Sequence, residues 1–283
     1  MNDYEQAKQQ GADAMAAGKR KVAMSLMAHP DDAEILAGGT LALLAEKGWE
    51  IHIVTMTPGD CGTADLGPEQ IARIRRDEAA AAAAVIGAQY HCLEARDLYV
   101  TFDQATLRRA MSVTRHISPT LVFTHSLNCY MMDHEVSAQI ARSVSFGFAI
   151  PNTTTGPIAV GAEVPHLYYA DAIEGTDAYG QPIDPSTYVD ISRSMETKTR
   201  MLKAHASQRQ WLLKHHGMDH YVQVMRDWSA KRGAQAGVQY AEGFRQHRGH
   251  PYPSACVLAA ELGSLVTHAS QATPRIRGTS DGN

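Results

Sequence analysis

Short apolar runs alternate with helical patterns along most of the chain. The run KVAMSLMA at 21–28 has the length of a buried strand, and residues 33–48 have the apolar spacing of a helix that ends at Gly48. Residues 50–57, EIHIVTMT, place β-branched and apolar side chains in alternation and predict a second strand. A strand, a helix and a strand in this order predict a βαβ unit with parallel strands and a right-handed crossover.

The alternation continues beyond this unit. Further strands are predicted over 90–95, 119–125, 165–173 and 187–191, and further helices over 69–87, 103–117, 133–148, 192–217 and 219–233. Helices that alternate with strands are typical of α/β proteins. We therefore expect a Rossmann-like, doubly wound, mostly parallel sheet with helices on both faces and appended C-terminal helices. Alternation along 165–173 should bury one member of the pair Tyr168 and Tyr169.

The chain shows no internal repeat and no linker between independent domains. We expect residues 1–20 to be a polar, amphipathic N-terminal extension and residues 21–266 to be a single α/β domain. Residues 267–283 are predicted to be a disordered tail, because they are polar and rich in glycine and serine.

Composition excludes several classes of protein. The chain of 283 residues is 44% hydrophobic and 20% charged, which is ordinary for a soluble protein, and its net charge of -4 favours neither nucleic acid nor an anionic membrane as partner. No apolar stretch has the length of a signal peptide core or a membrane span. The four cysteines are scattered without a CxxC pair, as expected of reduced thiols. We expect a cytoplasmic protein.

Polar side chains follow three of the predicted strands at their carboxyl ends. These residues are His29, Asp31 and Asp32 after the first strand, Asp60 after the second, and His125, Asp133 and His134 after the strand at 119–125. The carboxyl ends of parallel strands form the crevice in which ligands bind in open sheets. We therefore expect these side chains to lie at one edge of the sheet.

The residue types at this edge suit a metal. Two histidines and an aspartate, His29, Asp32 and His134, could hold Zn²⁺ with one coordination position open for water. Asp31 would then be available as a general base. An aspartate directly before a helix also serves as its N-cap, so spacing alone leaves a metal site and a helix cap open. Spacing also does not decide which aspartate is the ligand.

Two other chemistries lack their motifs. The glycine fingerprint G-x-G-x-x-G is absent after the first strand, which argues against dinucleotide binding. The chain also has no G-x-S-x-G elbow of a serine hydrolase.

The segment AHPDDAEILAGGTLALLAEKG resembles the signature of the PIG-L/LmbE-like family of zinc-dependent N-acetylglucosaminyl deacetylases. Four further stretches agree with that family in order and spacing: TMTPGDCG, RRDEAAAAAAVIGA, LVFTH followed by MDHE, and KTRMLKAHASQ. The resemblance extends over residues 21–208. It implies removal of an acetyl or short acyl group from an amidated sugar or glycoconjugate. Self-association into a homo-oligomer is the usual expectation for such enzymes.

The resemblance also implies roles for individual residues. It makes His29, Asp32 and His134 the ligands of one zinc ion per chain, or of another divalent transition metal, and it makes Asp31 the general base. Arg75 and Asp60 fall where the family contacts its substrate. From the sequence alone Arg75 could equally lie on a solvated helix face, and Asp60 could be a plain turn residue.

One position departs from the family pattern. The family often has His-Pro-Asp-His where this chain has Met131-Met132-Asp133-His134, and the first histidine is credited with stabilising the oxyanion or protonating the leaving amine. A thioether carries no proton and donates no hydrogen bond, so Met131 can do neither. Substitutes within the chain are His125, Tyr130, His247 and His250, of which His125 and Tyr130 are our predicted substrate contacts.

Two alternatives to a sugar deacetylase stay open. One is a metal-dependent amidase or hydrolase with a non-sugar substrate, which the departure at Met131 favours. The other is a non-catalytic sugar-binding protein on the same fold. The presence of Asp31 beside three ligands argues against it, because a pure binder needs no base. His205, in the stretch KAHASQ, is expected to pack beneath the site rather than to bind metal.

Overall fold

In the computed structural model the described residues are 20–153, 163–172, 175–209 and 221–269. The strands are β1 Val22–Met27, β2 Glu50–Thr55, β3 Gln89–Cys92, β4 Leu121–Thr124, β5 His166–Ala170, β6 Thr187–Asp190, β7 Ala241–Gln246 and β8 Val266–His268. The helices are α2 Asp32–Glu46, α3 Pro68–Ala84, α4 Gln104–Ile117, α5 Met132–Gly147, α6 Met195–Lys203, α8 Tyr221–Ala236 and α9 Val257–Leu262, with short 3-10 turns at Pro151–Thr153 and Gly263–Leu265.

All eight of these strands form one sheet, in the order β3-β2-β1-β4-β5-β7-β6-β8. Strands β1 to β5 pair in parallel, and β6, β7 and β8 add an antiparallel end. The predicted βαβ unit is present, because β1 pairs with β2 in parallel from Val22 opposite Glu50 to Met27 opposite Thr55. This topology confirms the predicted α/β fold with a mostly parallel sheet.

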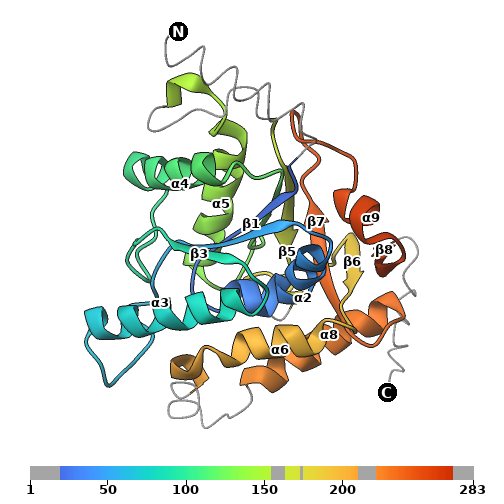
Figure 1. The fold of residues 1–283 in the computed structure, drawn as a ribbon, viewed down its shortest axis with the longest axis horizontal. Coiled ribbons are helices and arrows are strands. Elements are labelled where there is room, and N and C mark those ends of the chain that lie inside the picture. Colours follow the sequence, from blue (N-terminus) through green and yellow to red (C-terminus); the bar gives the residue numbers. More distant parts are fainter. Residues whose placement is uncertain (1–19, 154–162, 173–174, 210–220, 270–283) are drawn as a thin grey trace, which may run out of the picture.

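Helices cover both faces of the sheet. Figure 1 shows α4 and α5 on one side and α2, α3, α6 and α8 on the other. Strand β1 supplies both cores, since Ala23 and Met27 pack on the side of α2 while Met24 and Leu26 pack on the side of α5. A strand buried on both faces is apolar without interruption, which explains the run KVAMSLMA. None of the helices in the described part of the chain is both long and apolar enough to cross a lipid bilayer.

The described elements correct three details of the sequence prediction. Tyr168 and Tyr169 are both buried, because each face of the sheet is covered by helices. The helix predicted over 192–217 begins at Met195, and α6 ends at Lys203 before a turn at Ala204. Strand β7, strand β8 and helix α9 were not predicted, since none of them has a clear apolar period.

The expected chain ends are only partly described. Residues 1–19 of the predicted extension lie outside the described residues. At the other end, β8 pairs with β6 and includes the first two residues of the predicted tail, 267 and 268. The tail from residue 270 onward lies outside the described residues.

A buried ion pair fastens helix α2 to the antiparallel end of the sheet. Lys198 of α6 and Glu242 of β7 are 1% and 3% exposed, and Lys198 Nζ lies 2.7 Å from Glu242 Oε1. The two carboxylate oxygens also accept the backbone N–H groups of Gly39 and Thr40, each at 2.8 Å. A Cβ at Gly39 would overlap the Ile191 side chain. Glycine at this position therefore lets the residue that follows β6 pack closely against α2.

We expect Glu242→Ala to lower the free energy of unfolding by about 3–5 kcal/mol, because it leaves the Lys198 ammonium buried without its partner. Denaturant unfolding at neutral pH measures the change. The matched control is Glu196→Ala, which removes an exposed partner of Arg226 and should change stability little. Equal effects of the two substitutions would show that the buried pair does not fasten α2.

Candidate metal centre

The connection from β1 to α2 is only four residues long. It runs from Ala28 through His29 and Pro30 to Asp31, and the helix begins at Asp32. Asp31 has φ 103° and ψ -25°, a left-handed conformation that costs an L-residue energy. Its side chain makes no capping hydrogen bond to α2. Of the two interpretations that spacing left open, the structure therefore excludes a capping role for the Asp31 carboxylate.

Three side chains converge at the carboxyl edge of the sheet. Ligand atoms of His29, Asp32 and His134 all lie within 4.8 Å of one another, and all three residues are buried. His29 Nδ1 lies 3.3 Å from Asp32 Oδ2, and His134 Nε2 lies 3.6 Å from Asp32 Oδ1. This group of two imidazoles and a carboxylate, predicted from the sequence, can hold a divalent metal such as zinc.

The charges of Asp32 and His134 also fit a metal ligand set. Burial opposes ionisation of Asp32, but His134, His125 and His29 around it hold its pKa well below the usual range. Burial and the neighbouring His125 lower the pKa of His134 to about 3. An ionised carboxylate and a neutral imidazole are the forms that bind metal ions.

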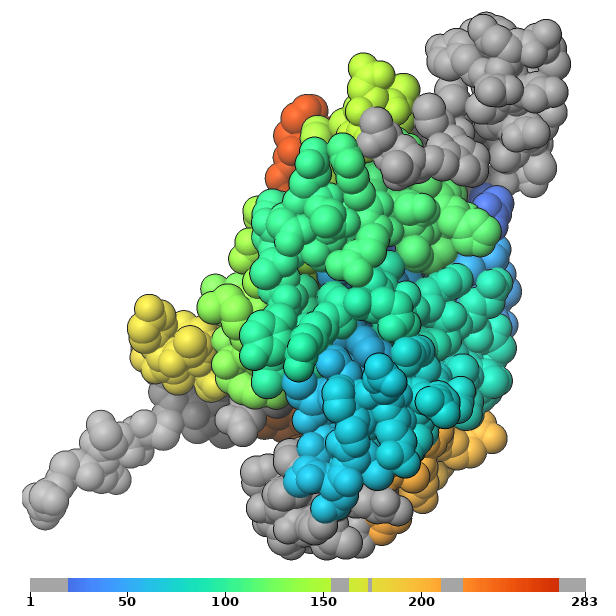
Figure 2. Space-filling model, turned by 90° about the vertical axis from the view of Figure 1, so that its left-hand side faces the viewer, coloured from blue at the N-terminus to red at the C-terminus, as the bar shows by residue number. Residues whose placement is uncertain are grey.

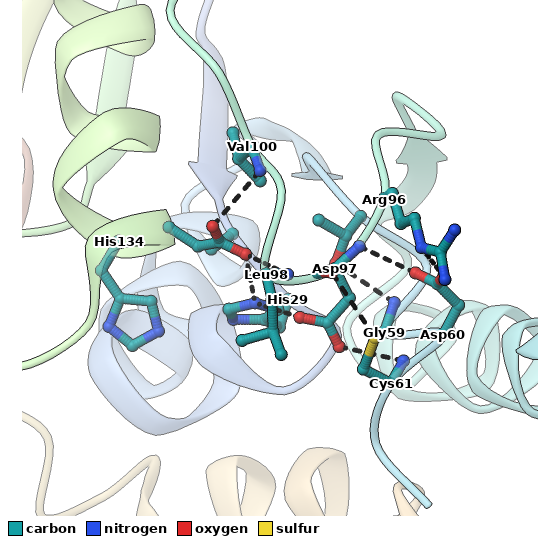
Figure 3. A network of polar contacts seen from close by, with 12 residues as sticks. His29, Gly59, Asp60, Cys61, Arg96, Asp97, Leu98, Val100 and His134 are labelled. Carbon is teal, nitrogen blue, oxygen red and sulfur yellow. Dashed lines mark hydrogen bonds and ion pairs between the residues drawn. The ribbon is translucent and has the colours of Figure 1, made fainter.

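Two carboxylates contact the far side of the His29 ring, and Figure 3 shows one of them, Asp97, beside His29. His29 Nε2 lies 3.0 Å from Asp97 Oδ1 and 3.4 Å from Asp133 Oδ2. Against the effect of burial, these carboxylates and Asp32 raise the pKa of His29 well above its ordinary value. Ligand histidines commonly donate their second ring N–H to a carboxylate. With a proton on Nε2, Nδ1 is left as the ring nitrogen that could bind a metal ion.

Asp97 was not predicted as a site residue, although the sequence held a signal for it. Asp97 follows β3 and therefore lies at the same carboxyl edge of the sheet as the other site residues. Asp133 was predicted to lie at this edge, but its contact with His29 was not predicted. Its carboxylate accepts the N–H groups of Leu98 at 2.7 Å and Val100 at 3.3 Å, so it also fixes the loop that carries Asp97.

The predicted substrate contacts lie in different surroundings. His125 is 1% exposed and stacks on His134, with ring centroids 4.0 Å apart. Its Nε2 lies 3.0 Å from the Ala28 nitrogen and 3.1 Å from Asp32 Oδ2, so the ring sits beneath the ligands. Tyr130 is 66% exposed, and its ring meets His134 edge-on at 5.4 Å.

Asp60 supports the loop of Asp97. Its Oδ1 accepts the Asp97 N–H at 2.8 Å, and its Oδ2 lies 3.8 Å from Arg96 Nε (Figure 3). Asp60 also lines a surface hollow of about 560 Å³, together with Pro58, Arg73, Arg76, Glu94 and Arg96. Figure 2 shows this face, with the start of α3 in cyan and the segment after β3 in teal. The hollow lies beside the ligand group, because Asp97 stands between Asp60 and His29.

Arg75 belongs to the buried interior of the site. It is 3% exposed, and its guanidinium donates to the backbone oxygens of Pro30 at 2.7 Å and Gly59 at 3.2 Å. A Cβ at Gly59 would overlap that guanidinium, so the glycine of the turn makes room for it. Arg75 Nη2 lies 3.6 Å from Asp31 Oδ2. A solvated helix face, the alternative that the sequence left open for Arg75, is therefore excluded.

Asp31 has a second neighbour that the sequence did not reveal. The hydroxyl of Tyr221, at the start of α8, donates a hydrogen bond to Asp31 Oδ2 at 2.5 Å. Burial raises the pKa of the Asp31 carboxyl, although the Arg75 guanidinium acts in the opposite direction. His205 lies beneath this group as expected; it is fully buried, with Nε2 3.4 Å from Glu34 Oε1.

The other possible substitutes for the missing histidine lie in varied places. His247 Nδ1 pairs with the Tyr169 hydroxyl at 2.9 Å, and His250 is exposed before a cis proline. Met131 occupies the N-cap position of α5 and makes no side-chain capping bond. Large apolar side chains are exposed on the loop after β3 and at the entry to α5, namely Leu98, Tyr99, Phe102, Tyr130 and Met132.

Sequence comparison with known proteins agrees with the predicted family resemblance. Residues 24–145 match the PIG-L family model, described as GlcNAc-PI de-N-acetylase. The chain is 28% identical to 4-oxalmesaconate hydratase of Pseudomonas putida, over 80% of this chain and 89% of that one. It is 26% identical to diacetylchitobiose deacetylase of Thermococcus kodakarensis, over 80% of this chain and 82% of that one.

A solved structure extends the likeness to three dimensions. The 4-carboxy-2-hydroxymuconate hydratase of Pseudomonas putida superimposes with a TM-score of 0.69 at 25% identity, over 83% of this chain and 100% of that one. Deacetylases and hydratases thus share this fold, and its relatives are enzymes. The matches confirm the resemblance predicted from the sequence: residues 24–145 match the PIG-L family model, and the chain shares the fold of solved relatives.

Proposed function

We propose that this protein is a zinc-dependent deacetylase that removes an acetyl or short acyl group from the nitrogen of an N-acetylglucosaminyl-type substrate. The observation that carries the proposal is the buried group His29, Asp32 and His134 beside Asp31, a carboxylate that caps no helix. In this assignment the two histidines and Asp32 hold one zinc ion per chain, and another divalent transition metal is the alternative occupant.

We assign roles to the protein groups from their positions. Bound zinc would lower the pKa of water from about 15.7 towards about 7 and polarise the amide carbonyl. Asp31 accepts a proton from the attacking water and returns it to the leaving amine as the C–N bond breaks. Asp97 and Asp133 hold the His29 ring, and Arg75 faces both Asp31 and the turn at Gly59. The products are a short carboxylic acid and a free amine.

The substrate class comes from the relatives. The family model is described as acting on GlcNAc-PI, and one relative is named for diacetylchitobiose. We assign an amidated sugar or a small glycoconjugate, with Tyr130 as an exposed aromatic contact beside His134. We place the activity in the cytoplasm, where the scattered cysteines stay reduced. Residues 21–266 would act as one catalytic domain.

A metal-dependent hydratase is the second candidate. The hydratase of Pseudomonas putida is 28% identical over most of both chains. Addition of water to a carbon–carbon double bond has no leaving amine to protonate, so it does not need the histidine that Met131 replaces. In that reaction the hydroxyl adds to one carbon, and Asp31 delivers the proton to the other.

Release of free amine from N-acetyl sugars by zinc-loaded protein tests the first candidate. Loss of absorbance by an unsaturated oxo-tricarboxylate, the substrate class of the named hydratases, tests the second. Amine release supports the deacetylase. Hydration without amine release replaces it with the hydratase. Sugar binding without either reaction would support the non-catalytic alternative.

His134→Ala is expected to abolish stoichiometric metal binding, because it removes one of three ligands. Metal analysis of protein purified without a His-tag should find about one zinc per wild-type chain and well under that in the variant. The control is His116→Ala, which removes an exposed histidine of α4 and should leave metal content unchanged. Full zinc content in His134→Ala would contradict the proposed ligand set.

Asp31→Asn is expected to keep the metal and to lower kcat by about 10²–10⁴, the usual contribution of a positioned base. An amide has nearly the shape of a carboxylate but does not accept the water proton. Steady-state amine release and metal analysis of the same samples measure both effects. Wild-type turnover in this variant would show that Asp31 is not the base.

A further inference from the structure

The two carboxylate oxygens of Asp31 have different surroundings. Oδ2 accepts the Tyr221 hydroxyl at 2.5 Å and lies 3.6 Å from Arg75 Nη2. Within the described residues Oδ1 accepts no hydrogen bond. We propose that Tyr221 is the positioning residue of the general base: it anchors Oδ2 and thereby leaves Oδ1 as the oxygen that takes the proton. This inference rests on the proposed function, in which Asp31 is that base.

The surroundings of Tyr221 suit a fixed donor. Its ring packs against the core that α2, α6 and α8 share, so the hydroxyl is held by packing at the first position of α8. Burial, with Asp31 nearby, raises the pKa of Tyr221 well above its ordinary value. The phenol therefore stays protonated at neutral pH. It donates a hydrogen bond to Asp31 and does not transfer its proton.

The other groups near Asp31 do not replace this bond. Arg75 directs its guanidinium at the backbone oxygens of Pro30 and Gly59, and His205 and Glu34 face each other deeper in the core. Among the described residues, the Tyr221 hydroxyl is the one hydrogen-bond donor to the Asp31 carboxylate. The backbone of Asp31 is fixed in its left-handed conformation, so orientation of the carboxylate depends on this contact.

Tyr221→Phe removes the hydroxyl and keeps the packed ring. We expect kcat for amine release to fall about 10- to 100-fold, the scale of a misplaced catalytic group, with KM and zinc content within about twofold of wild type. In an Asp31→Asn background the same substitution should change kcat by less than about twofold, because Tyr221 acts through Asp31. The control Tyr188→Phe removes a buried hydroxyl of β6, 3.5 Å from Gln235, and should leave kcat unchanged.

Two outcomes would overturn the inference. One is wild-type kcat in Tyr221→Phe while Asp31→Asn is impaired as proposed. The other is an equal fold-loss from Tyr221→Phe in both backgrounds, which would show that the tyrosine acts independently of Asp31. The thermal midpoints of wild type, Tyr221→Phe, Asp31→Asn and the double variant form the same double-mutant cycle without a measurement of turnover. If the shifts of the two single variants add up in the double variant, the contact does not couple the two residues.

Failure of the proposed function gives a different result. If zinc-loaded wild type releases no amine from any N-acetyl sugar, the deacetylase assignment fails. The thermal cycle then decides the Tyr221–Asp31 contact by itself.

Discussion

The site depends on how abruptly strand β1 passes into helix α2. Four residues complete the change, and Asp31 accommodates it with a left-handed backbone. Because of this turn, two neighbouring carboxylates point to different surroundings. The Asp32 carboxylate accepts the backbone N–H of His29 at 2.7 Å and joins the ligand group, whereas the Asp31 carboxylate faces Tyr221 and Arg75.

The rest of the fold keeps this turn in place. Parallel strands bring the loops after β1, β2, β3 and β4 to one edge, where Asp97 and His134 meet His29 and Asp32. From the opposite side, Glu242 of β7 accepts two backbone N–H groups in the middle of α2. The unpredicted antiparallel end of the sheet therefore holds the helix that starts at the metal centre.

Local pattern was enough to predict the parallel part of the sheet and the edge at which the site residues gather, whereas the choice of His29, Asp32 and His134 as ligands came from the family resemblance. His29, Asp31 and Asp32 stand at a strand end that the apolar run marks clearly, and the βαβ unit fixes which edge they occupy. The same reasoning could not find Tyr221, because its contact with Asp31 joins residues 190 positions apart and leaves no period in the sequence. His125 was also predicted to contact substrate, because the position of a residue after a strand does not reveal that its side chain is buried beneath a metal ligand.

Strained backbone is concentrated around the ligands. Among the described residues, four that are not glycine have positive φ, and three of them, Asp31, Glu94 and Leu98, lie on the loops of the candidate site. Each such residue costs of the order of 1–3 kcal/mol. Glycine at these positions would relieve that cost and release the loops that carry the carboxylates. A search for heat-resistant variants of this protein would therefore select substitutions here that weaken its chemistry, and stability and activity would be optimised at each other's expense.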